Sequence, residues 1–270
     1  MNIRIKFKKH GVMKYIGHLD MMRYFQKAIR RADIDIAYSG GYSPHQIMSF
    51  AAPLGVGVTS DGEYFDIEVH STKSSQESIQ ALNETMAEGI SILEYKKLPD
   101  TAKTSMSLVA AADYLVYANE GYQPLAETVE ELQEKVQKFY EGQKEILITK
   151  QTKKREMEMD LKPLIYEMKA LTLSSQPALF LKVCTGSTDN IKPELVWKAF
   201  CDFYGMEYHD MAFQVHRLEV YAKADEIPVK GEQERKLYAD YLERQRRNYQ
   251  KEGKKFPEFF TLGELGEEIF

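Results

Sequence analysis

The chain has 270 residues, of which 43% are hydrophobic and 29% are charged, as is typical of a globular protein. The sequence contains no run of the roughly 18 apolar residues that a membrane helix needs, and its first residues alternate where a signal peptide would be uniformly apolar. The two cysteines, Cys184 and Cys201, match neither a disulfide framework nor a metal-ligand spacing, so we expect buried free thiols and a cytoplasmic location.

Charge is distributed unevenly along the chain. The formal net charge is −5, which argues against a general nucleic-acid binder. Residues 1–48, however, carry nine Lys and Arg against three Asp, a net of +6, so the other 222 residues carry −11. Such an asymmetry is typical of a binding site for phosphate or another anion, and equally of an ordinary solvated face.

Hydrophobic periodicity predicts the elements of the first domain, residues 1–98. The first helix begins at 21, with Asp20 as its cap, or one turn earlier at Gly17 and His18. The full set is strands at 2–8, 34–38, 63–69 and 90–98, and helices at 21–32 and 74–88. The order β-α-β-β-α-β is that of the ferredoxin-like fold.

The same order recurs after a polar linker at 99–107, in a second domain at 108–222. Its predicted elements are strands at 113–118, 145–150, 166–173, 178–184 and 216–222, helices at 126–141 and 193–204, and an irregular connection at 157–165. Residues 223–270 are polar and predict a mobile tail with a helix at about 232–251. The predicted fold class is therefore α+β, with two ferredoxin-like domains and this tail.

A set of basic, aromatic and glycine residues near the N-terminus indicates RNA or phosphate binding. Lysine and arginine contact phosphate, loop tyrosines stack on bases, and glycine-rich turns bring backbone N–H groups close to an anion. The candidates are Lys6, Lys8, Arg23, Lys27, Arg30, Arg31, Gly41, Tyr42, Ser43, Gly55 and Gly57. A core edge for the tyrosines and a tight turn for the glycines are the structural alternatives.

His18 and His45 are the candidate catalytic residues. Each lies in a predicted loop near glycine, where an imidazole is suited to acid–base work at neutral pH. Asp20 could orient the imidazole of His18, although a plain helix-capping role is the alternative. A metal site from these three residues and Glu63 is conceivable, but no spacing demands one, and we predict no metal and no cofactor.

Five motifs resemble those of the radical-SAM-linked protein family, over residues 1–220. They are His18–Leu19–Asp20, Lys27–Ala28–Ile29–Arg30–Arg31–Ala32, Gly41–Tyr42–Ser43–Pro44–His45, the segment Leu54–Gly55–Val56–Gly57–Val58–Thr59–Ser60–Asp61–Gly62–Glu63, and Asp160–Leu161–Lys162–Pro163. The resemblance implies a radical SAM protein as partner and a link to RNA metabolism. The chain has no CxxxCxxC cluster for an iron–sulfur centre, so it would be the accessory component.

These observations favour an accessory RNA- or substrate-binding protein that acts with a radical SAM enzyme in RNA modification. Asp160 and Lys162 are expected at an interdomain contact, in which Asp160 pairs with the basic helix. One rival is a metal-independent RNA-processing enzyme that uses His18 and His45. The other is a protein-interaction module that docks through its tail. No membrane association is expected.

Overall fold

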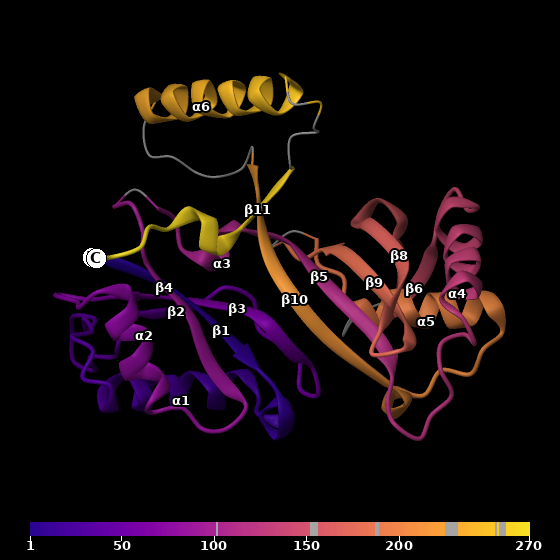
Figure 1. The fold of residues 1–270 in the computed structure, drawn as a ribbon, viewed down its shortest axis with the longest axis horizontal. Coiled ribbons are helices and arrows are strands. Elements are labelled where there is room, and N and C mark those ends of the chain that lie inside the picture. Colours follow the sequence, from indigo (N-terminus) through magenta and orange to yellow (C-terminus); the bar gives the residue numbers. More distant parts are fainter. Residues whose placement is uncertain (101, 152–155, 187–188, 225–231, 252, 254–257) are drawn as a thin grey trace. The chain divides into compact units, whose positions relative to one another are not determined.

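The chain folds into two compact units of mixed α+β structure. A computed structural model describes residues 1–100, 102–151, 156–186, 189–224, 232–251, 253 and 258–270 (Figure 1). Unit 1 comprises residues 1–56, 61–110 and 220–270, and unit 2 comprises residues 57–60 and 111–219. The predicted α+β class is confirmed. Parts of the predicted tail, at 225–231, 252 and 254–257, lie outside the described residues.

The helices and strands follow one another in two series. Up to residue 108 they are β1 (Asn2–Lys9), η1 (Gly11–Tyr15), α1 (His18–Arg31), β2 (Met48–Phe50), β3 (Thr59–Glu68), α2 (Ser75–Asn83), β4 (Ile90–Lys97) and α3 (Ser105–Leu108). From residue 109 they are β5 (Val109–Ala118), α4 (Val129–Val136), η2 (Gln137–Glu141), β6 (Leu147–Gln151), β7 (Glu156–Asp160), η3 (Lys162–Leu164), β8 (Ile165–Leu173), β9 (Gln176–Cys184), α5 (Pro193–Tyr204), η4 (Asp210–Ala212), β10 (Phe213–Lys223), α6 (Glu232–Lys251), β11 (Phe259–Thr261) and η6 (Leu262–Leu265).

Three sequence predictions differ from these elements. The predicted strand at 34–38 makes only two isolated bridges. The second strand along the chain is instead β2, at Met48–Phe50. The segment 157–165, predicted as irregular, begins with β7, which pairs with β6 along its whole length. The predicted linker at 99–107 runs into helix α3.

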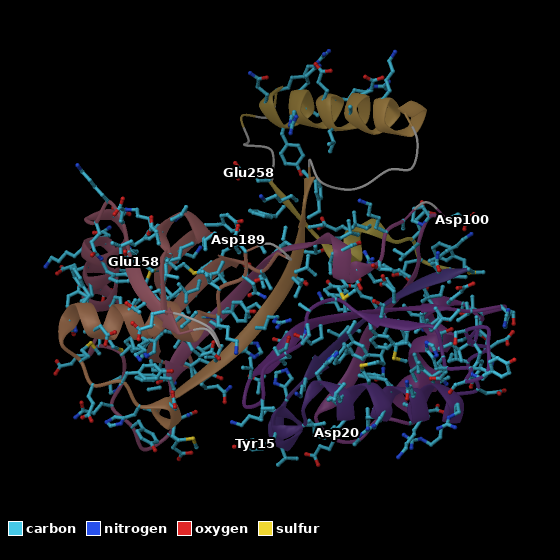
Figure 2. All side chains as sticks on the ribbon, turned by 180° about the vertical axis from the view of Figure 1, so that it is seen from behind. Tyr15, Asp20, Asp100, Glu158, Asp189 and Glu258 are labelled. Atoms are coloured by element: carbon cyan, nitrogen blue, oxygen red, sulfur yellow. The ribbon has the colours of Figure 1, made fainter. Side chains whose placement is uncertain are left out.

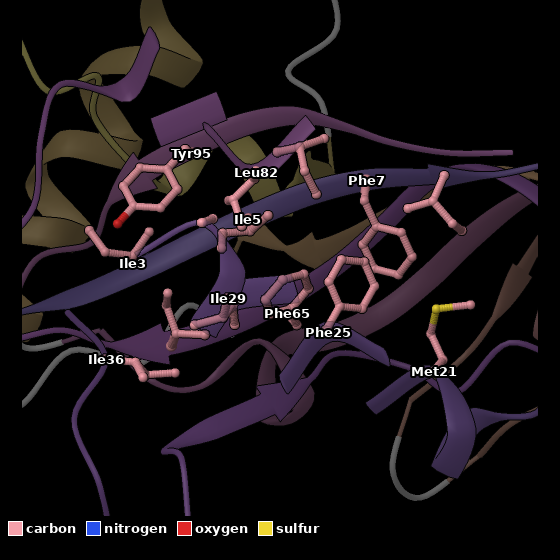
Figure 3. Close-up of a cluster of buried hydrophobic side chains, with 14 of the residues drawn as sticks. Ile3, Ile5, Phe7, Met21, Phe25, Ile29, Ile36, Phe65, Leu82 and Tyr95 are labelled. Carbon is pink, nitrogen blue, oxygen red and sulfur yellow. The ribbon is translucent and has the colours of Figure 1, made fainter. Parts of the chain in front are cut away.

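Unit 1 buries one face of its strands under two helices. Its strands lie in the order β4-β1-β3, and β2 pairs with β3. Strand β1 points alternate side chains, including Ile5 and Phe7, into the core, where α1 adds Phe25 and Ile29 (Figure 3). Phe25 lies 4.7 Å from both Phe7 and Phe65 between ring centroids. Each such buried side chain contributes about 1.5–3 kcal/mol, so this cluster fixes α1 on the sheet.

The opposite side of β1 holds a buried ion pair. The guanidinium of Arg4 donates to both carboxylate oxygens of Asp66, at 2.8 Å and 3.0 Å. Its third nitrogen donates to the carbonyl of Leu262, and the Asp66 carboxylate also accepts from the N–H of Ser105. Arg4 is therefore part of the interior of unit 1.

The last twelve residues are packed into unit 1, which corrects the expectation of a mobile tail for this segment. Leu262 is fully buried. The backbones of Lys97 and Glu267 exchange two hydrogen bonds of 2.9 Å, and Ser75 donates its N–H to the carbonyl of Ile269. The segment docks because its apolar residues and backbone groups find partners far away in the sequence. The helix predicted at 232–251 is confirmed as α6.

Unit 2 has its own core. Its strands lie in the order β10-β5-β9-β8, while β6 and β7 form a separate two-stranded hairpin. Helix α5 begins with Pro193 at its first turn and ends at Gly205, whose φ of +62° is the left-handed cap that glycine favours. The ring of Trp197 stacks on that of Phe200 at 5.0 Å, and both are buried.

Replacing Arg4 with alanine is expected to lower the free energy of unfolding by about 3–5 kcal/mol, because the Asp66 carboxylate would stay buried without its counter-charge. Urea denaturation measures the change. The matched control is Arg23→Ala, which removes an exposed ion pair with Asp20 and should cost less than about 1 kcal/mol. Equal costs for the two variants would contradict the structural role given to Arg4.

Truncation after residue 258 should destabilise unit 1 by at least about 2 kcal/mol, because it removes the buried Leu262 side chain and the carbonyl that Arg4 contacts. Thermal unfolding of the truncated and full-length chains checks this. The control is Phe270→Ala, since the Phe270 side chain is fully exposed. A truncated chain as stable as the full-length one would restore the mobile-tail interpretation.

Candidate functional site

His18 is the first residue of α1, directly after Gly17 at the N-cap. The structure thus selects the earlier of the two predicted helix starts. The imidazole is half-buried and meets the ring of Phe50 edge-on, with 5.4 Å between centroids. Burial lowers the pKa of His18 below its ordinary value of 6.5, because the positive imidazolium loses hydration. His18 is therefore neutral at pH 7 and able to accept a proton.

Two buried charged side chains line the same small hollow as His18. Lys9 and Glu63 are 3% and 4% exposed, and the rest of the wall is largely apolar. We call this site the His18 hollow; its lining is Phe7, Lys9, His18, Met21, Phe50, Ala52, Leu54 and Glu63. Its volume of about 20 Å³ holds roughly one water molecule.

The side chains of a lysine, a glutamate and a histidine around one water-sized space form a set of groups suited to moving a proton. Lys9 is held in place because its ammonium donates to the carbonyl of Ile16 at 2.7 Å. Neither Lys9 nor Glu63 was predicted for this role, although Glu63 was considered as a metal ligand. Each lies two residues from a buried phenylalanine of its strand, Lys9 after Phe7 and Glu63 before Phe65. A charged residue at a position where the alternation predicts an apolar one is the sequence feature that indicates them.

Asp20 does not share this hollow. Its carboxylate lies on the outside of α1, where it accepts from Arg23 at 3.1 Å, and both side chains are about two-thirds exposed. Side chains two residues apart on a helix point in nearly opposite directions, so Asp20 is not placed to orient the imidazole of His18. Figure 2 shows Asp20 and Tyr15 at the outer edge of unit 1.

His45 closes the loop that carries the predicted Gly41, Tyr42 and Ser43. Its Nδ1 atom lies 2.8 Å from the hydroxyl of Ser39, and its carbonyl accepts from the Ser39 N–H. Gly41 has a φ of +100°, which glycine adopts readily, and Tyr42 is fully exposed. His45 is not among the residues that line the His18 hollow, so the structure does not bring the two predicted histidines together there.

The four predicted cations of α1 form one exposed surface. We call it the basic face of α1, and it consists of Arg23, Lys27, Arg30 and Arg31. Arg30 donates to the carbonyl of Gln26 at 3.3 Å, and Gln46 donates to the same carbonyl at 3.2 Å. Gln46 follows His45 directly. The base of the loop that carries Tyr42 therefore lies beside Arg30.

The remaining phosphate candidates have different surroundings. Lys6 is half-buried, with its ammonium 3.8 Å from a Glu94 oxygen and 5.5 Å from the Tyr64 ring centre. Lys8 is also half-buried. Gly55 is exposed, and Gly57 has a φ of +89° in the turn that leads into β3, as a tight turn requires.

Asp160 and Lys162 make their described hydrogen bonds inside unit 2. The Asp160 carboxylate accepts from the N–H groups of Ile146 and Lys162, at 2.8 Å and 3.0 Å. The Lys162 ammonium donates to the carbonyls of Tyr140 and Gln143. These contacts fix the end of the β6–β7 hairpin against η2, and the interdomain role stays a prediction.

Two further observations concern metals and membranes. Within the described ranges, no three His, Cys, Asp or Glu side chains are grouped so that they could hold a metal ion. Within the same part of the chain, no helix is both long enough and apolar enough to cross a membrane.

We expect the NMR titration midpoint of His18 to lie below 6.5. The unfolded chain would then bind the proton more readily than the folded chain, so folding stability falls as the pH drops through about 6.5. Phe50→Ala should move the midpoint toward the ordinary value because it admits water to the hollow. Phe203→Ala, in unit 2, is the control and should not move it. A midpoint above 6.5 would contradict this picture.

Comparisons with known proteins place the chain in a family. No curated protein matches it. A chain of the structure "Crystal Structure of a Cbf5-Nop10-Gar1 Complex" matches with 10% identity and a TM-score of 0.42, over 81% of this chain and 48% of that one. This chain therefore spans about half the length of that relative. A protein described as an unknown protein from Galdieria sulphuraria matches with 10% identity and a TM-score of 0.20, over 80% of this chain and 96% of that one. The family described as "Uncharacterized protein conserved in bacteria (DUF2344)" matches residues 2–193, and the chain belongs to this family.

Proposed function

We propose that this protein is an accessory RNA- or substrate-binding protein that acts with a radical SAM enzyme in RNA modification. The observation that carries the proposal is the shared carbonyl of Gln26, which accepts from both Arg30 and Gln46. It holds an exposed cation beside a loop whose Tyr42 is fully exposed. Cations that contact phosphate, next to an aromatic ring that can stack on a base, are the two elements of single-strand binding.

The basic face of α1 supports binding of a polyanion. Arg23 forms an exposed ion pair with Asp20, which competition from phosphate can open at little cost. Arg31 donates to the carbonyl of Thr85 and keeps the rest of its guanidinium available to solvent. Because successive cations are spaced four, three and one residues apart, they follow one side of the helix and can track a phosphate backbone.

The covered sheet face of unit 1 supports the helix and the loop as the proposed RNA contact. We propose that both units are ferredoxin-like, which their matching strand orders β4-β1-β3-β2 and β10-β5-β9-β8 support. An open sheet face with stacking aromatics would be the usual RNA platform of such a domain. In unit 1 that face contains the buried Arg4 and is covered by the segment with Leu262, so we propose that RNA meets α1 and the Tyr42 loop.

The accessory role rests on the motif resemblance and on the cysteines. Cys184 and Cys201 are both buried, and two thiols are fewer than the three of a CxxxCxxC cluster. The iron–sulfur chemistry would belong to the partner, and this chain would present the RNA to it. Co-purification of the tagged chain with a radical SAM protein tests this part of the proposal.

A second candidate function is RNA processing by the chain itself, and the His18 hollow is the observation that favours it. A neutral imidazole beside Lys9 and Glu63 can take a proton from a hydroxyl. His45, the other histidine of this hypothesis, does not line the hollow, so the observation bears on His18 alone. Cleavage of RNA by the purified chain, lost in His18→Ala with binding retained, would support the candidate.

We expect Lys27→Ala combined with Arg30→Ala to weaken binding of a fluorescent single-stranded RNA. The slope of log affinity against log salt should fall by about 1.4, because each cation–phosphate contact contributes about 0.7 to the slope on a single strand. Tyr42→Ala should weaken binding by roughly fivefold or more without changing the slope, since stacking is uncharged. Fluorescence anisotropy at several salt concentrations measures both effects.

The matched control for charge is Lys138→Ala combined with Lys144→Ala, which removes two exposed cations from unit 2. It should leave binding unchanged if the basic face of α1 is the contact surface. Equal losses of affinity in the two double variants would mean that RNA binds by general charge attraction, and no binding by the parent chain would refute the RNA proposal.

A further inference from the structure

A second and larger hollow opens on unit 2, between the β6–β7 hairpin and α5. Its volume is about 460 Å³, within the range of about 300–1,000 Å³ that is usual for binding sites. Its apolar lining includes Phe139, Ile146, Leu147, Ile148, Leu195 and Phe203. None of the site residues that were predicted from the sequence lines this hollow. We call it the β6–α5 groove.

Strand β6 presents its edge to this groove. Residues 146–149 all line it, one after another. Because successive side chains of a strand point to opposite faces, four consecutive residues can reach one hollow only if the strand turns its edge toward it. β6 pairs with β7 along one edge, and no second strand within the described residues pairs with its other edge.

The hydrogen-bond pattern shows which backbone groups are available. The N–H of Leu161 donates to the carbonyl of Ile146, and the pairing continues with Ile148 opposite Met159. In an antiparallel pair, bonded and non-bonded residues alternate, so the N–H and C=O groups of Leu147 and Thr149 point away from β7. In the described part of the chain, no backbone group outside the hairpin bonds to them. Leu147 and Thr149 are two residues apart, which is the spacing at which an added antiparallel strand forms its hydrogen bonds.

Helix α5 supplies the other wall. Residues 195, 198, 199, 202 and 203 form a stripe at spacings of three and four along one side of the helix, while Trp197 and Phe200 face the core of unit 2. Phe203 is 46% exposed and Leu147 is 53% exposed on opposite walls of the groove. Large apolar side chains exposed together around a hollow are typical of an interaction site.

The two charged residues of this α5 stripe indicate which side chains a bound peptide would place opposite them. Lys198 and Asp202 lie four residues apart, and neither makes an ion pair with any residue that the structure describes. Four residues of helix rise about 6 Å, close to the roughly 6.6 Å spanned by two residues of a strand. A strand laid along α5 can therefore place an acidic side chain opposite Lys198 and, two residues on, a basic side chain opposite Asp202.

We propose that the β6–α5 groove binds an extended peptide segment of a partner protein, which adds as a strand to the free edge of β6. The peptide backbone bonds to Leu147 and Thr149, its apolar side chains fill the hollow, and an acidic–x–basic pattern faces α5. Strand addition of this kind takes its affinity from main-chain hydrogen bonds and its specificity from alternate side chains. The site is independent of RNA binding by unit 1.

The test uses a defined pool of labelled nonapeptides and the full-length chain. Each peptide carries glutamate and lysine two positions apart, and its other positions are drawn from valine, leucine, phenylalanine, serine and threonine. We expect saturable binding in fluorescence anisotropy. N-methylation of the amides that face β6 should weaken binding at least roughly fivefold, whereas methylation of the alternate set should not.

Two variants locate the binding on the chain. Thr149→Pro removes an N–H that points away from β7, which an edge strand tolerates, and should weaken binding about fivefold, while Thr149→Val keeps the N–H and should bind as the parent does. Lys198→Glu should weaken binding roughly threefold or more, and Lys138→Glu, outside the groove, should not.

Circular dichroism is used to check that each variant is folded. If the Thr149→Pro chain does not fold, the methylation and Lys198 comparisons decide. The proposal is overturned if no peptide of the pool binds saturably. It is also overturned if methylation of either set has the same effect, or if Lys198→Glu binds as Lys138→Glu does.

Discussion

The buried ion pair of Arg4 and Asp66 is the interaction on which the arrangement of unit 1 depends. It joins β1 to β3, and its remaining hydrogen-bonding groups take up the N–H of Ser105 and the carbonyl of Leu262. A buried pair repays its loss of hydration only if its geometry is good and its other polar atoms are satisfied. Here that requirement brings four distant parts of the chain to one point. The part of the sheet face around Arg4, opposite α1, is consequently interior.

Helix α1 carries both candidate sites of unit 1. At its start, His18 shares a water-sized hollow with the buried side chains of Lys9 and Glu63. The exposed cations lie along its outer side. There the carbonyl of Gln26 accepts hydrogen bonds from Arg30 and from Gln46, which follows the Tyr42 loop. A ligand that lies along the basic face of α1 would have a charged backbone and a group that can stack. The two sites share a helix, so the aromatic cluster that holds Phe25 also holds both in place.

Local patterns predicted the elements whose burial has a clear period. The apolar stripe in 193–204 and the alternation in 90–98 correspond to α5 and β4 within one residue at each end. In both, the spacing of the buried side chains alone identifies the element. The segment 34–38 has the same strand-like composition but forms only isolated bridges, since pairing depends on partners elsewhere. The docking of Leu262 was hidden for the same reason: its partner is 258 residues away. Among site residues, the exposed cations of α1 could be predicted from helical spacing alone, whereas the link from Gln46 to Gln26 depends on tertiary structure.

The discontinuous make-up of unit 1 sets an order of events during synthesis. Its three segments, 1–56, 61–110 and 220–270, are separated by nearly all of unit 2. Once residue 219 has left the ribosome, unit 2 is complete and can fold, but Arg4 and Lys96 still lack the backbone carbonyls of Leu262 and Gly263. Contacts of such long sequence separation form late and slowly. The nascent chain therefore carries a finished second unit and an unfinished first one, with the hydrogen bonds of Arg4 and Lys96 incomplete, until Leu262 and Gly263 leave the exit tunnel.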